Sequence, residues 1–404
     1  MTETIQIRCN KDFLDFLDLM ESNTSAFFDS NLRSMTGMES IHVQLETDLE
    51  FSEKMCRRIG GAFKYFKGVF DGNNHTISAI CEKTTSLFSS IYFSKVRNLN
   101  IHNMKGSRSF ILADDALGCE FENVNLTGSM YVSESIGAFV RTAQQVTFRN
   151  CDVELETSTF FNTKPTEDNT AEKEDDTPPY FGGFVGVDLG ETKFIDCSIS
   201  GKISSEVAVG GFCAIARNSV FTDCNVLGLT VTGNREVGLF VGRGSQDLRF
   251  DRCIVTDSTA VGNYWVSYLV GKSTGKIYVN KLLAENCFIN PKSTLSYAGG
   301  IAGSADGIYM YNSTLQGSIN AHIILAGISP DVADCELGNN NIELSITAIG
   351  YQPMMTHAYK LVREDFLTTD GKEIKFAQGG NNAKVTLVEL ELEGTFNPFE
   401  ESLL

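Results

Sequence analysis

Polar and apolar residues alternate in short runs along most of the chain, and one polar position recurs at a nearly fixed interval. A triplet recurs nine times, with a polar middle residue followed by a small or apolar residue. The middle residues are Asn98, Asn123, Asn150, Asp196, Asp223, Arg252, Asn286, Asn312 and Asp334. Their third residues are separated by 25, 27, 46, 27, 29, 34, 26 and 22 residues. One unit is therefore typically 25 to 29 residues long, which is typical of a solenoid.

A second series of apolar residues, each near a glycine or another small residue, keeps step with these triplets. Its members are Phe88, Phe110, Phe139, Phe184, Phe212, Phe240, Leu269, Ile301 and Ile328. Each unit also contains three short apolar or alternating runs separated by Gly, Asn, Asp or Ser. Period 2 recurs throughout, and no helical period is sustained. The pattern predicts an all-β fold, a parallel β-helix of about ten coils with three strands per coil.

The recurring Asn or Asp has two explanations that the sequence leaves open. Short amides and carboxylates tolerate the left-handed backbone of a sharp turn, so each one can simply be a good turn residue. Alternatively, amides stacked at one place on every coil can hydrogen-bond to one another along the stack as a ladder.

The two ends of the chain depart from the repeat, and we interpret them as caps. Residues 1–60 are predicted to form an N-terminal cap: a strand from Thr4 to Cys9, a helix from Lys11 to Glu21 with Asn10 as its N-cap, and a strand from Ile41 to Leu45. Residues 351–404 are predicted to form a C-terminal cap, in which the stretch Lys384 to Glu393 alternates as a charged edge strand. The β-helix itself is predicted to occupy residues 61–350.

One acidic insertion interrupts the helix. The interval from Cys151 to Cys197 is about 19 residues longer than its neighbours, and Lys164 to Asp176 contains six acidic residues and two lysines. Residues 158–180 are therefore predicted to project from one coil as a loop, either a tolerated insertion or a segment that binds a partner.

The stretch Phe66 to Ile77 reads FKGVFDGNNHTI, and Asp-Gly-Asn-Asn between two apolar runs is a tight turn by its own chemistry. It resembles the opening of the helix in GLUG-motif-type, pectate-lyase-like proteins. Gly182 to Gly186 and Gly238 to Gly242 resemble the glycine-rich motif of that family. The resemblance covers roughly residues 4 to 350 and implies a right-handed helix, with a secreted or cell-surface adhesin or glycan binder as one function. Asn74 departs from the glycine that the family favours.

Composition narrows the possible partners and the compartment. The formal charge is −18, from 33 basic and 51 acidic residues, so nucleic acid and anionic membranes are poor partners. The first twenty residues do not resemble a secretory signal, and no apolar run approaches the length of a membrane span. With eleven cysteines expected to be free thiols, we predict an intracellular, cytoplasmic protein that is monomeric unless it is part of a larger assembly.

The cysteines and histidines do not form a recognisable site. Cys151, Cys197, Cys224, Cys253, Cys287 and Cys335 are predicted to share one phase of the coil. Such a row does not converge as a tetrahedral metal site, and we interpret these side chains as packed core thiols. The histidines His42, His75, His102, His322 and His357 show no metal-binding spacing. We therefore assign no metal ligands and no cofactor.

Enzymes with this fold gather acids and a basic residue on one face. The nearest equivalent here is Asp114-Asp115, with Arg141 and Asp188 on later coils. Neither a glycine-flanked His nor an Arg-x-Lys pair accompanies these residues, so we assign no catalytic residue. The leading hypothesis is a non-enzymatic binding or scaffold rod that contacts a protein or glycan partner. A secreted adhesin or glycan binder is the alternative, followed by a polysaccharide lyase or hydrolase.

Overall fold

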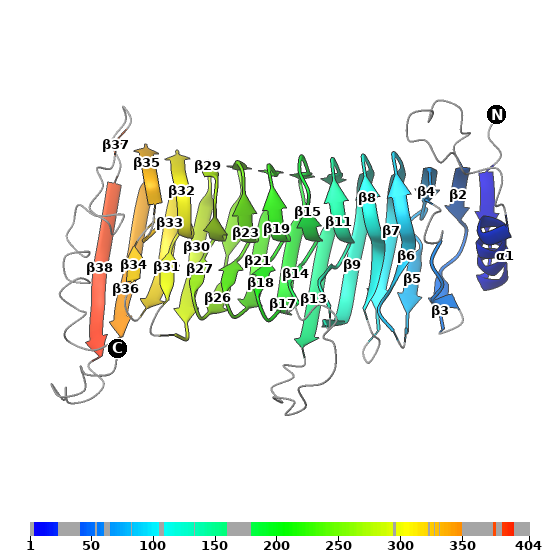
Figure 1. Ribbon diagram of the computed structural model, residues 1–404, viewed down its shortest axis with the longest axis horizontal. Coiled ribbons are helices and arrows are strands. Elements are labelled where there is room, and N and C mark those ends of the chain that lie inside the picture. Colours follow the sequence, from blue (N-terminus) through cyan, green and yellow to red (C-terminus); the bar gives the residue numbers. More distant parts are fainter. Residues whose placement is uncertain are drawn as a thin grey trace, which may run out of the picture.

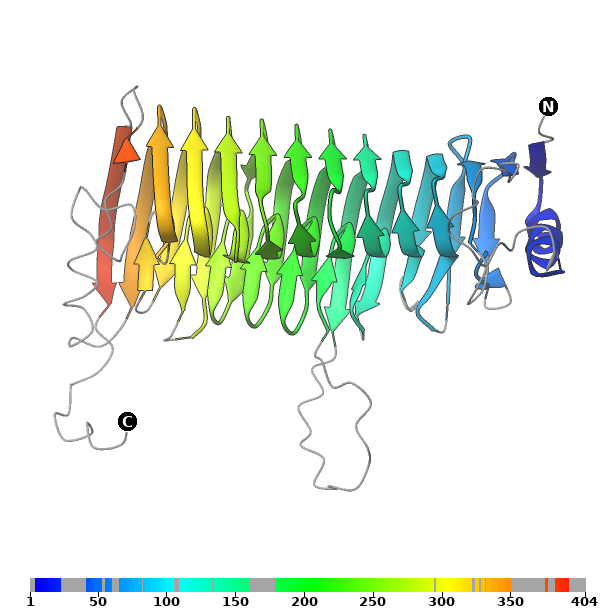
Figure 2. The same cartoon turned by 45° about the horizontal axis from the view of Figure 1, so that its top comes forward.

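The protein is an all-β parallel β-solenoid of about nine turns with one short N-terminal helix, as the sequence predicts. Successive coils stack side by side into a rod (Figures 1 and 2). This computed structural model describes residues 4–22, 41–52, 55–59, 65–81, 83–104, 109–132, 134–159, 179–293, 296–321, 324–326, 328–330, 332–349, 375–376 and 382–391.

The coils present four ladders of parallel strands, and long strands bend from one ladder into the next. The first ladder contains β1 (Thr4–Ile7), β2 (Ile41–Leu45), β4 (Gly68–Asp71), β7 (Lys95–Asn103), β9 (Glu120–Val132), β12 (Thr147–Arg149), β16 (Lys193–Ile195), β20 (Val220–Thr222), β24 (Leu248–Asp251), β29 (Lys276–Asn280), β32 (Ala302–Tyr311), β35 (Val332–Gly338) and β37 (Lys375–Phe376). The second contains β3 (Leu49–Phe51), β5 (Thr76–Ala79), parts of β7 and β9, β13 (Asp152–Thr159), β17 (Ser198–Ser204), β21 (Asn225–Thr232), β25 (Ile254–Thr256), β26 (Thr259–Gly262), β30 (Leu283–Pro291), β33 (Thr314–Ala321), β36 (Asn341–Ile349) and β38 (Asn382–Glu391).

The other two ladders lie next to each other along the rod. The third contains β6 (Thr85–Tyr92), β8 (Phe110–Leu117), β11 (Val140–Gln144), β15 (Val185–Asp188), β19 (Cys213–Arg217), β23 (Val241–Ser245), β28 (Val270–Ser273) and the start of β32. The fourth is a separate seven-stranded sheet of short strands, β10 (Ile136–Gly137), β14 (Phe181–Gly182), β18 (Ala208–Gly210), β22 (Glu236–Gly238), β27 (Trp265–Ser267), β31 (Tyr297–Gly299) and β34 (Ile324–Ala326).

A left-handed residue turns the chain at the same corner of nine successive coils. Positive φ angles between 50° and 56° occur at Asn98, Asn123, Asn150, Asp196, Asp223, Arg252, Lys281, Asn312 and Asn339. The first six and Asn312 are middle residues of the predicted triplets. The predicted members Asn286 and Asp334 are wrong, because the strand register places Lys281 and Asn339 at this corner instead.

The two errors have separate physical reasons. Asn286 is also left-handed, with φ of 53°, but it turns a different corner, where its Nδ2 donates to Asp257 Oδ1 at 3.2 Å. Asp334 lies within β35 and pairs with Gly307. The sequence pattern did not identify Lys281, because lysine is not a typical residue of left-handed turns.

The amides at this corner form the ladder that the sequence left as one of two alternatives. Near the N-terminal end, Asn123 Nδ2 donates to Asn98 Oδ1 at 3.0 Å and Asn150 Nδ2 donates to Asn123 Oδ1 at 2.7 Å. Near the other end, Asn339 Nδ2 donates to Asn312 Oδ1 at 2.8 Å. Each bond joins neighbouring coils, so the ladder adds side-chain hydrogen bonds between coils to the backbone bonds of the sheets.

Two columns of phenylalanine fill the core. The column predicted from the second series contains Phe139, Phe184, Phe212 and Phe240, with ring centroids 4.8 to 5.0 Å apart. A second column, which the sequence analysis missed, contains Phe121, Phe148, Phe194, Phe221 and Phe250 at similar spacing. The columns meet edge to face, a favourable ring geometry. The predicted members Phe88 and Phe110 are wrong. Phe110 pairs with Thr85, and Leu112 lies beside Phe139. Phe88 pairs with Ala113, which pairs with Val140 rather than with Phe139.

The N-terminal helix α1 (Asn10–Ser22) lies at one end of the rod (Figure 1). Its predicted apolar face is confirmed, since Phe13, Phe16, Leu17 and Met20 are all buried. Phe13 packs against Phe51 of β3 with ring centroids 4.7 Å apart. The helix thereby covers core side chains at the open end of the first coils.

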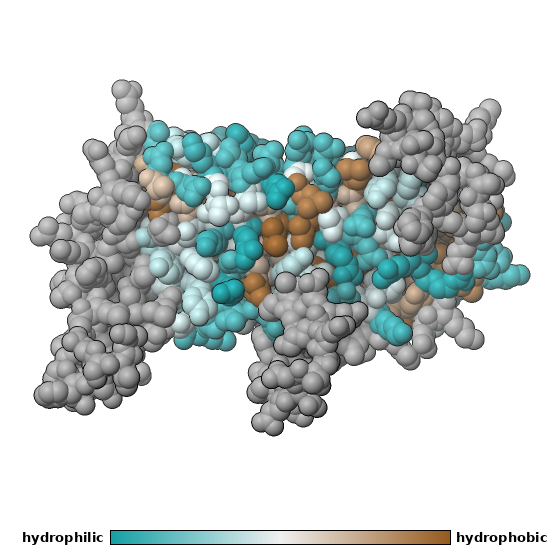
Figure 3. Space-filling model, viewed as in Figure 1, coloured by the Kyte–Doolittle hydropathy of each residue, from teal (hydrophilic) through white to brown (hydrophobic). Residues whose placement is uncertain are grey.

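Much of the predicted acidic loop and of the C-terminal cap lies outside the described residues. Residues 160–178, 350–374 and 392–404 belong to this group, so the division into a central helix and two caps remains a prediction. The predicted C-terminal strand is present as β38, which pairs in parallel with β36. Among the described residues, no helix has the length and apolar character needed to cross a bilayer. On the face seen in Figure 3, hydrophobic residues gather near the middle of a largely hydrophilic surface.

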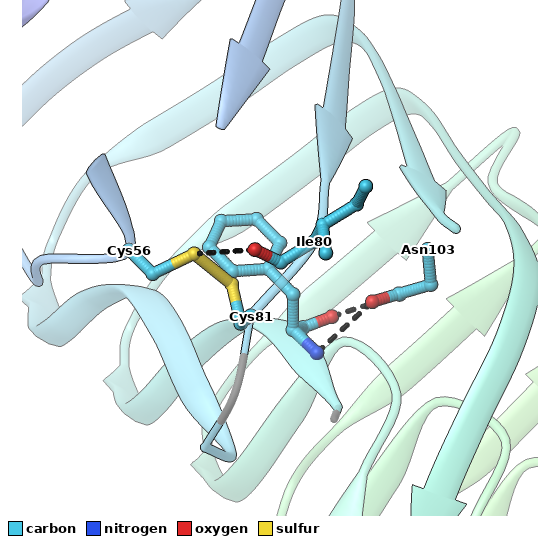
Figure 4. Close-up of a disulfide and its surroundings, with 5 residues drawn as sticks. Cys56, Ile80, Cys81 and Asn103 are labelled. Atoms are coloured by element: carbon cyan, nitrogen blue, oxygen red, sulfur yellow. Dashed lines mark hydrogen bonds between the residues drawn. A yellow bond between two sulfur atoms is a disulfide. The ribbon is translucent and has the colours of Figure 1, made fainter. Parts of the chain in front are cut away.

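The expectation of eleven free thiols is wrong for two cysteines. Cys56 and Cys81 form a disulfide that joins the segment after β3 to the segment after β5 (Figure 4). Both lie outside the regular row of cysteines, at a bend one coil apart where the side chains face each other rather than in parallel. The remaining nine cysteines are free, and all but Cys9 are buried. Cytoplasmic localisation remains a prediction, and the disulfide weakens the part of its argument that relied on free thiols.

Candidate functional site

The seven-stranded sheet meets the neighbouring ladder of β15, β19, β23 and β28 along one side of the rod, and we call this seam the groove. On each coil, a residue on the first sheet faces the residue seven positions later on the second. Three such pairs are Ala208 with Ile215, Glu236 with Arg243, and Trp265 with Lys272. The strand registers place these pairs on consecutive coils.

The groove deepens where one of these residues is small. Ala208 lies between Tyr180 and Glu236 along its sheet, and it is nearly inaccessible although it does not belong to the apolar core cluster. A cavity of about 430 Å³ occupies this position, lined by Tyr180, Glu206, Val207, Ala208, Ile215, Asn234, Arg235 and Arg243. We call this cavity the Ala208 notch. Its volume lies in the range of small-ligand sites.

One residue that lines the notch, Arg243, belongs to an ion pair. Arg243 Nη2 lies 2.7 Å from both carboxylate oxygens of Glu236, and the Glu236 side chain is only 4% exposed. A buried carboxylate requires such a partner, because removing a charge from water costs several kcal/mol. The pair therefore fixes the orientation of the guanidinium at the wall of the notch.

Aromatic side chains continue the groove beyond this wall. Lys272 Nζ lies 4.1 Å from the centre of the Trp265 ring, a cation–π contact. Trp265 stacks on Tyr297 with ring centroids 6.0 Å apart, and Tyr264 lies at the same distance from Trp265 on the outer side. Rings, guanidinium groups, an amide and carboxylates thus lie within three consecutive coils, a composition suited to binding rather than to any single reaction.

The predicted acidic candidates lie on an earlier part of the same side of the rod, and the structure brings three of them together. Asp114 Oδ1 lies 3.4 Å from Arg141 Nε, and Arg141 Nη1 lies 2.7 Å from Glu134 Oε2. Arg58 approaches the other oxygen of Asp114 at 3.0 Å. Burial and the neighbouring Asp114 carboxylate raise the pKa of Asp115. The carboxylates of Asp114 and Glu134 are held by arginines, which favours a structural network.

Asp188 does not join this group. It is 1% exposed and points inward, where its carboxylate accepts hydrogen bonds from the Gly190 amide at 2.8 Å, Thr192 Oγ1 at 2.7 Å and Ser219 Oγ at 2.5 Å. Burial raises the pKa of Asp188, and these donors partly oppose the shift. Asp188 is therefore a buried residue that holds the turn at Gly190 and Thr192 by hydrogen bonds, rather than a surface residue.

Four of the six cysteines predicted to share a phase do so. Cys151, Cys197, Cys224 and Cys253 follow the left-handed residue on four successive coils and are fully buried. Cys287 and Cys335 are wrong, because the corner register places Leu282 and Asn340 at their expected positions. Among the described residues, no three His, Cys, Asp or Glu side chains converge as a metal site.

The sequence analysis missed the groove residues. Glu236, Arg243, Trp265 and Lys272 are chemically diverse, so no motif groups them. A usable signal was present in the seven-residue spacing of Glu134 with Arg141, Glu236 with Arg243 and Trp265 with Lys272. Seven residues take the chain from the end of one short strand, around a corner, to the start of the next strand. The spacing therefore predicts which side chains face each other once the path of the coil is known.

Comparisons with known proteins identify neither a family nor a function for this chain. No protein-family model matches the chain, and no curated protein matches it. Among solved structures, the chain is similar to a crystal structure named as a putative immunoglobulin A1 protease from Bacteroides ovatus, with 13% identity. The match covers 94% of this chain and 83% of that chain, with a TM-score of 0.29. A likeness of this strength identifies no function, and the GLUG-type resemblance remains a prediction.

Proposed function

We propose that this protein is a binding rod that holds a segment of a glycan or protein partner in the groove around the Ala208 notch. The observation that carries the proposal is the notch itself, a cavity of about 430 Å³ bounded by a guanidinium that a buried carboxylate holds in place. Since the walls come from three consecutive coils, a partner bound along the groove contacts a rigid surface that needs no rearrangement.

The chemistry of the walls supports a partner that offers both apolar and polar groups. Ile215 and Val207 provide apolar contact, while Asn234 and the exposed Arg235 provide hydrogen-bond donors at the mouth. Tyr180, from the preceding coil, also lines the notch. Sugar rings and peptide side chains both present this mixture of surfaces.

Filling the notch tests the proposal. Ala208→Phe places a ring in the space that a partner would occupy, and Thr230→Phe on β21 adds the same ring at a half-buried position outside the notch. Wild-type protein and both variants would be applied to glycan and peptide arrays, and the hits would be confirmed by calorimetry. We expect Ala208→Phe to weaken binding by about tenfold or more, equivalent to about 1.4 kcal/mol, with Thr230→Phe unchanged.

Two results would contradict this function. Equal binding by wild type and Ala208→Phe would place the partner elsewhere on the rod. Cleavage of a glycan or peptide, lost on Asp114→Ala, would instead support the enzymatic alternative, because Asp114 lies in the only acidic and basic cluster that the sequence analysis identified as a candidate active site. Thermal unfolding of each variant would confirm that the fold is retained.

A further inference from the structure

A column of four thiols lies inside the rod, separate from the groove and from the proposed function. Cys151, Cys197, Cys224 and Cys253 occupy equivalent positions on four successive coils and are fully buried and free. Parallel strands in neighbouring coils are about 4.8 Å apart, so successive cysteines are separated by about that distance. We call this row the thiol column.

The four thiols point the same way. Each Sγ lies near the carbonyl oxygen two residues earlier in its own coil, at 3.3 Å for Cys151 and Cys197, 3.4 Å for Cys224 and 3.7 Å for Cys253. The repeated contact means that the side chains share one orientation. Neighbouring sulfur atoms therefore lie side by side along the rod axis, separated by about the distance between coils.

This spacing suits an ion that takes two ligands in a line. A metal–thiolate bond of about 2.3 Å on each side of an ion gives a sulfur–sulfur separation of about 4.6 Å, close to the distance between coils. Thiolates favour soft metal ions, and soft ions with a filled d shell accept linear coordination. We propose that the thiol column is a two-coordinate binding site for a soft d¹⁰ metal ion, held between Cys197 and a neighbouring cysteine.

The charge of the complex selects among such ions. With Hg(II), two S–H bonds break, two S–Hg bonds form and two protons leave to water, so the product is neutral and nothing is oxidised or reduced. With Cu(I) or Ag(I), the same exchange leaves one negative charge. Because burial of an unpaired charge is costly and the surrounding carbonyl groups are hydrogen-bond acceptors, the apolar core favours Hg(II).

The test uses Hg(II) as the probe, in a Cys9→Ser background that removes the exposed free thiol. Cys197→Ser with Cys253→Ser leaves no two adjacent thiols in the column. Cys213→Ser with Cys287→Ser is the matched control, since it removes two fully buried thiols outside the column. Each protein would be incubated natively and also refolded with the ion, then washed with a competing small thiol.

We expect the background and the control to retain about one Hg(II) per chain with a two-sulfur X-ray absorption signature, and the column variant to lose retention by about tenfold or more. Circular dichroism would verify that all three proteins are folded. Equal retention by the column variant and the control, or removal of the ion from every protein by the competing thiol, would overturn the proposal. Failure here leaves the groove proposal unaffected, because the two sites share no residue.

Discussion

The phenylalanine columns provide a direct test of how the rod is stabilised, and Phe194 is the position to change. Its ring stacks between Phe148 and Phe221, with centroids 5.0 and 4.9 Å away and nearly parallel planes. It also meets Phe184 and Phe212 edge to face, at 5.7 and 5.4 Å. Because Phe194 is fully buried, Phe194→Ala leaves a cavity at the junction of both columns.

The expected loss follows from these contacts. Replacing a buried Phe by Ala typically costs about 3 to 5 kcal/mol. Each aromatic pair contributes about 0.5 to 1.5 kcal/mol beyond area burial, so a ring in four pairs belongs at the upper end, near 5 kcal/mol. Phe194→Leu keeps most of the apolar volume and should recover about half of that loss.

Urea unfolding followed by circular dichroism would measure these differences. The control is Phe288→Ala, because Phe288 is 51% exposed and its truncation should change the free energy of unfolding by about 0.5 kcal/mol or less. A loss for Phe194→Ala within about 1 kcal/mol of the control would refute the reasoning, since it would mean that the stacked rings add little to the stability of the coils.

Three further predictions concern the corners and ends of the rod. Asn123→Ala should destabilise the fold by about 1 to 3 kcal/mol in thermal unfolding, because it removes two hydrogen bonds of the ladder. It also places a residue with a Cβ and no local hydrogen bond at φ of 54°. Asn123→Gly should cost less, because glycine adopts this turn without strain. The pKa of Asp188 is raised, so the folded state binds its proton more tightly than the unfolded state does. The free energy of unfolding, relative to that of Asp188→Asn, should therefore fall as the pH rises from 3.8 through the raised pKa. A difference between the two proteins that does not change across this pH range would contradict the burial argument. Cys56→Ser with Cys81→Ser should lower stability by about 3 to 4 kcal/mol from loss of a loop of 25 residues, and thiol titration of the wild type in denaturant without reductant should find nine thiols, not eleven.

The fold could be predicted because its cause is local and repeated. Each coil needs a left-handed turn and a buried apolar residue at a fixed phase, and Asn98, Asn123 and Phe139 supply these from the expected residue types. The prediction failed where another residue type fills the same role. Lys281 adopts the turn without an amide, and Leu112 fills the core position expected for Phe110.

The groove could not be predicted in the same way. Its cavity exists because Ala208 is smaller than Tyr180 and Glu236 on the adjacent coils, and an alanine in a strand looks like an ordinary core residue until the register is known. The disulfide was missed for a related reason, since Cys56 and Cys81 meet at a bend outside the regular repeat. Features set by register between distant segments require the structure.

The central claim, that the groove holds a partner, is tested most directly by photo-crosslinking in native cells. A photoreactive residue would replace Ala208 at the notch in one protein and Thr230 on β21 in another, and the crosslinked products would be identified after purification under denaturing conditions. The account predicts one recurrent glycan or protein adduct at position 208 that is absent at position 230. Equal adducts at the two positions, or none at 208, would contradict it.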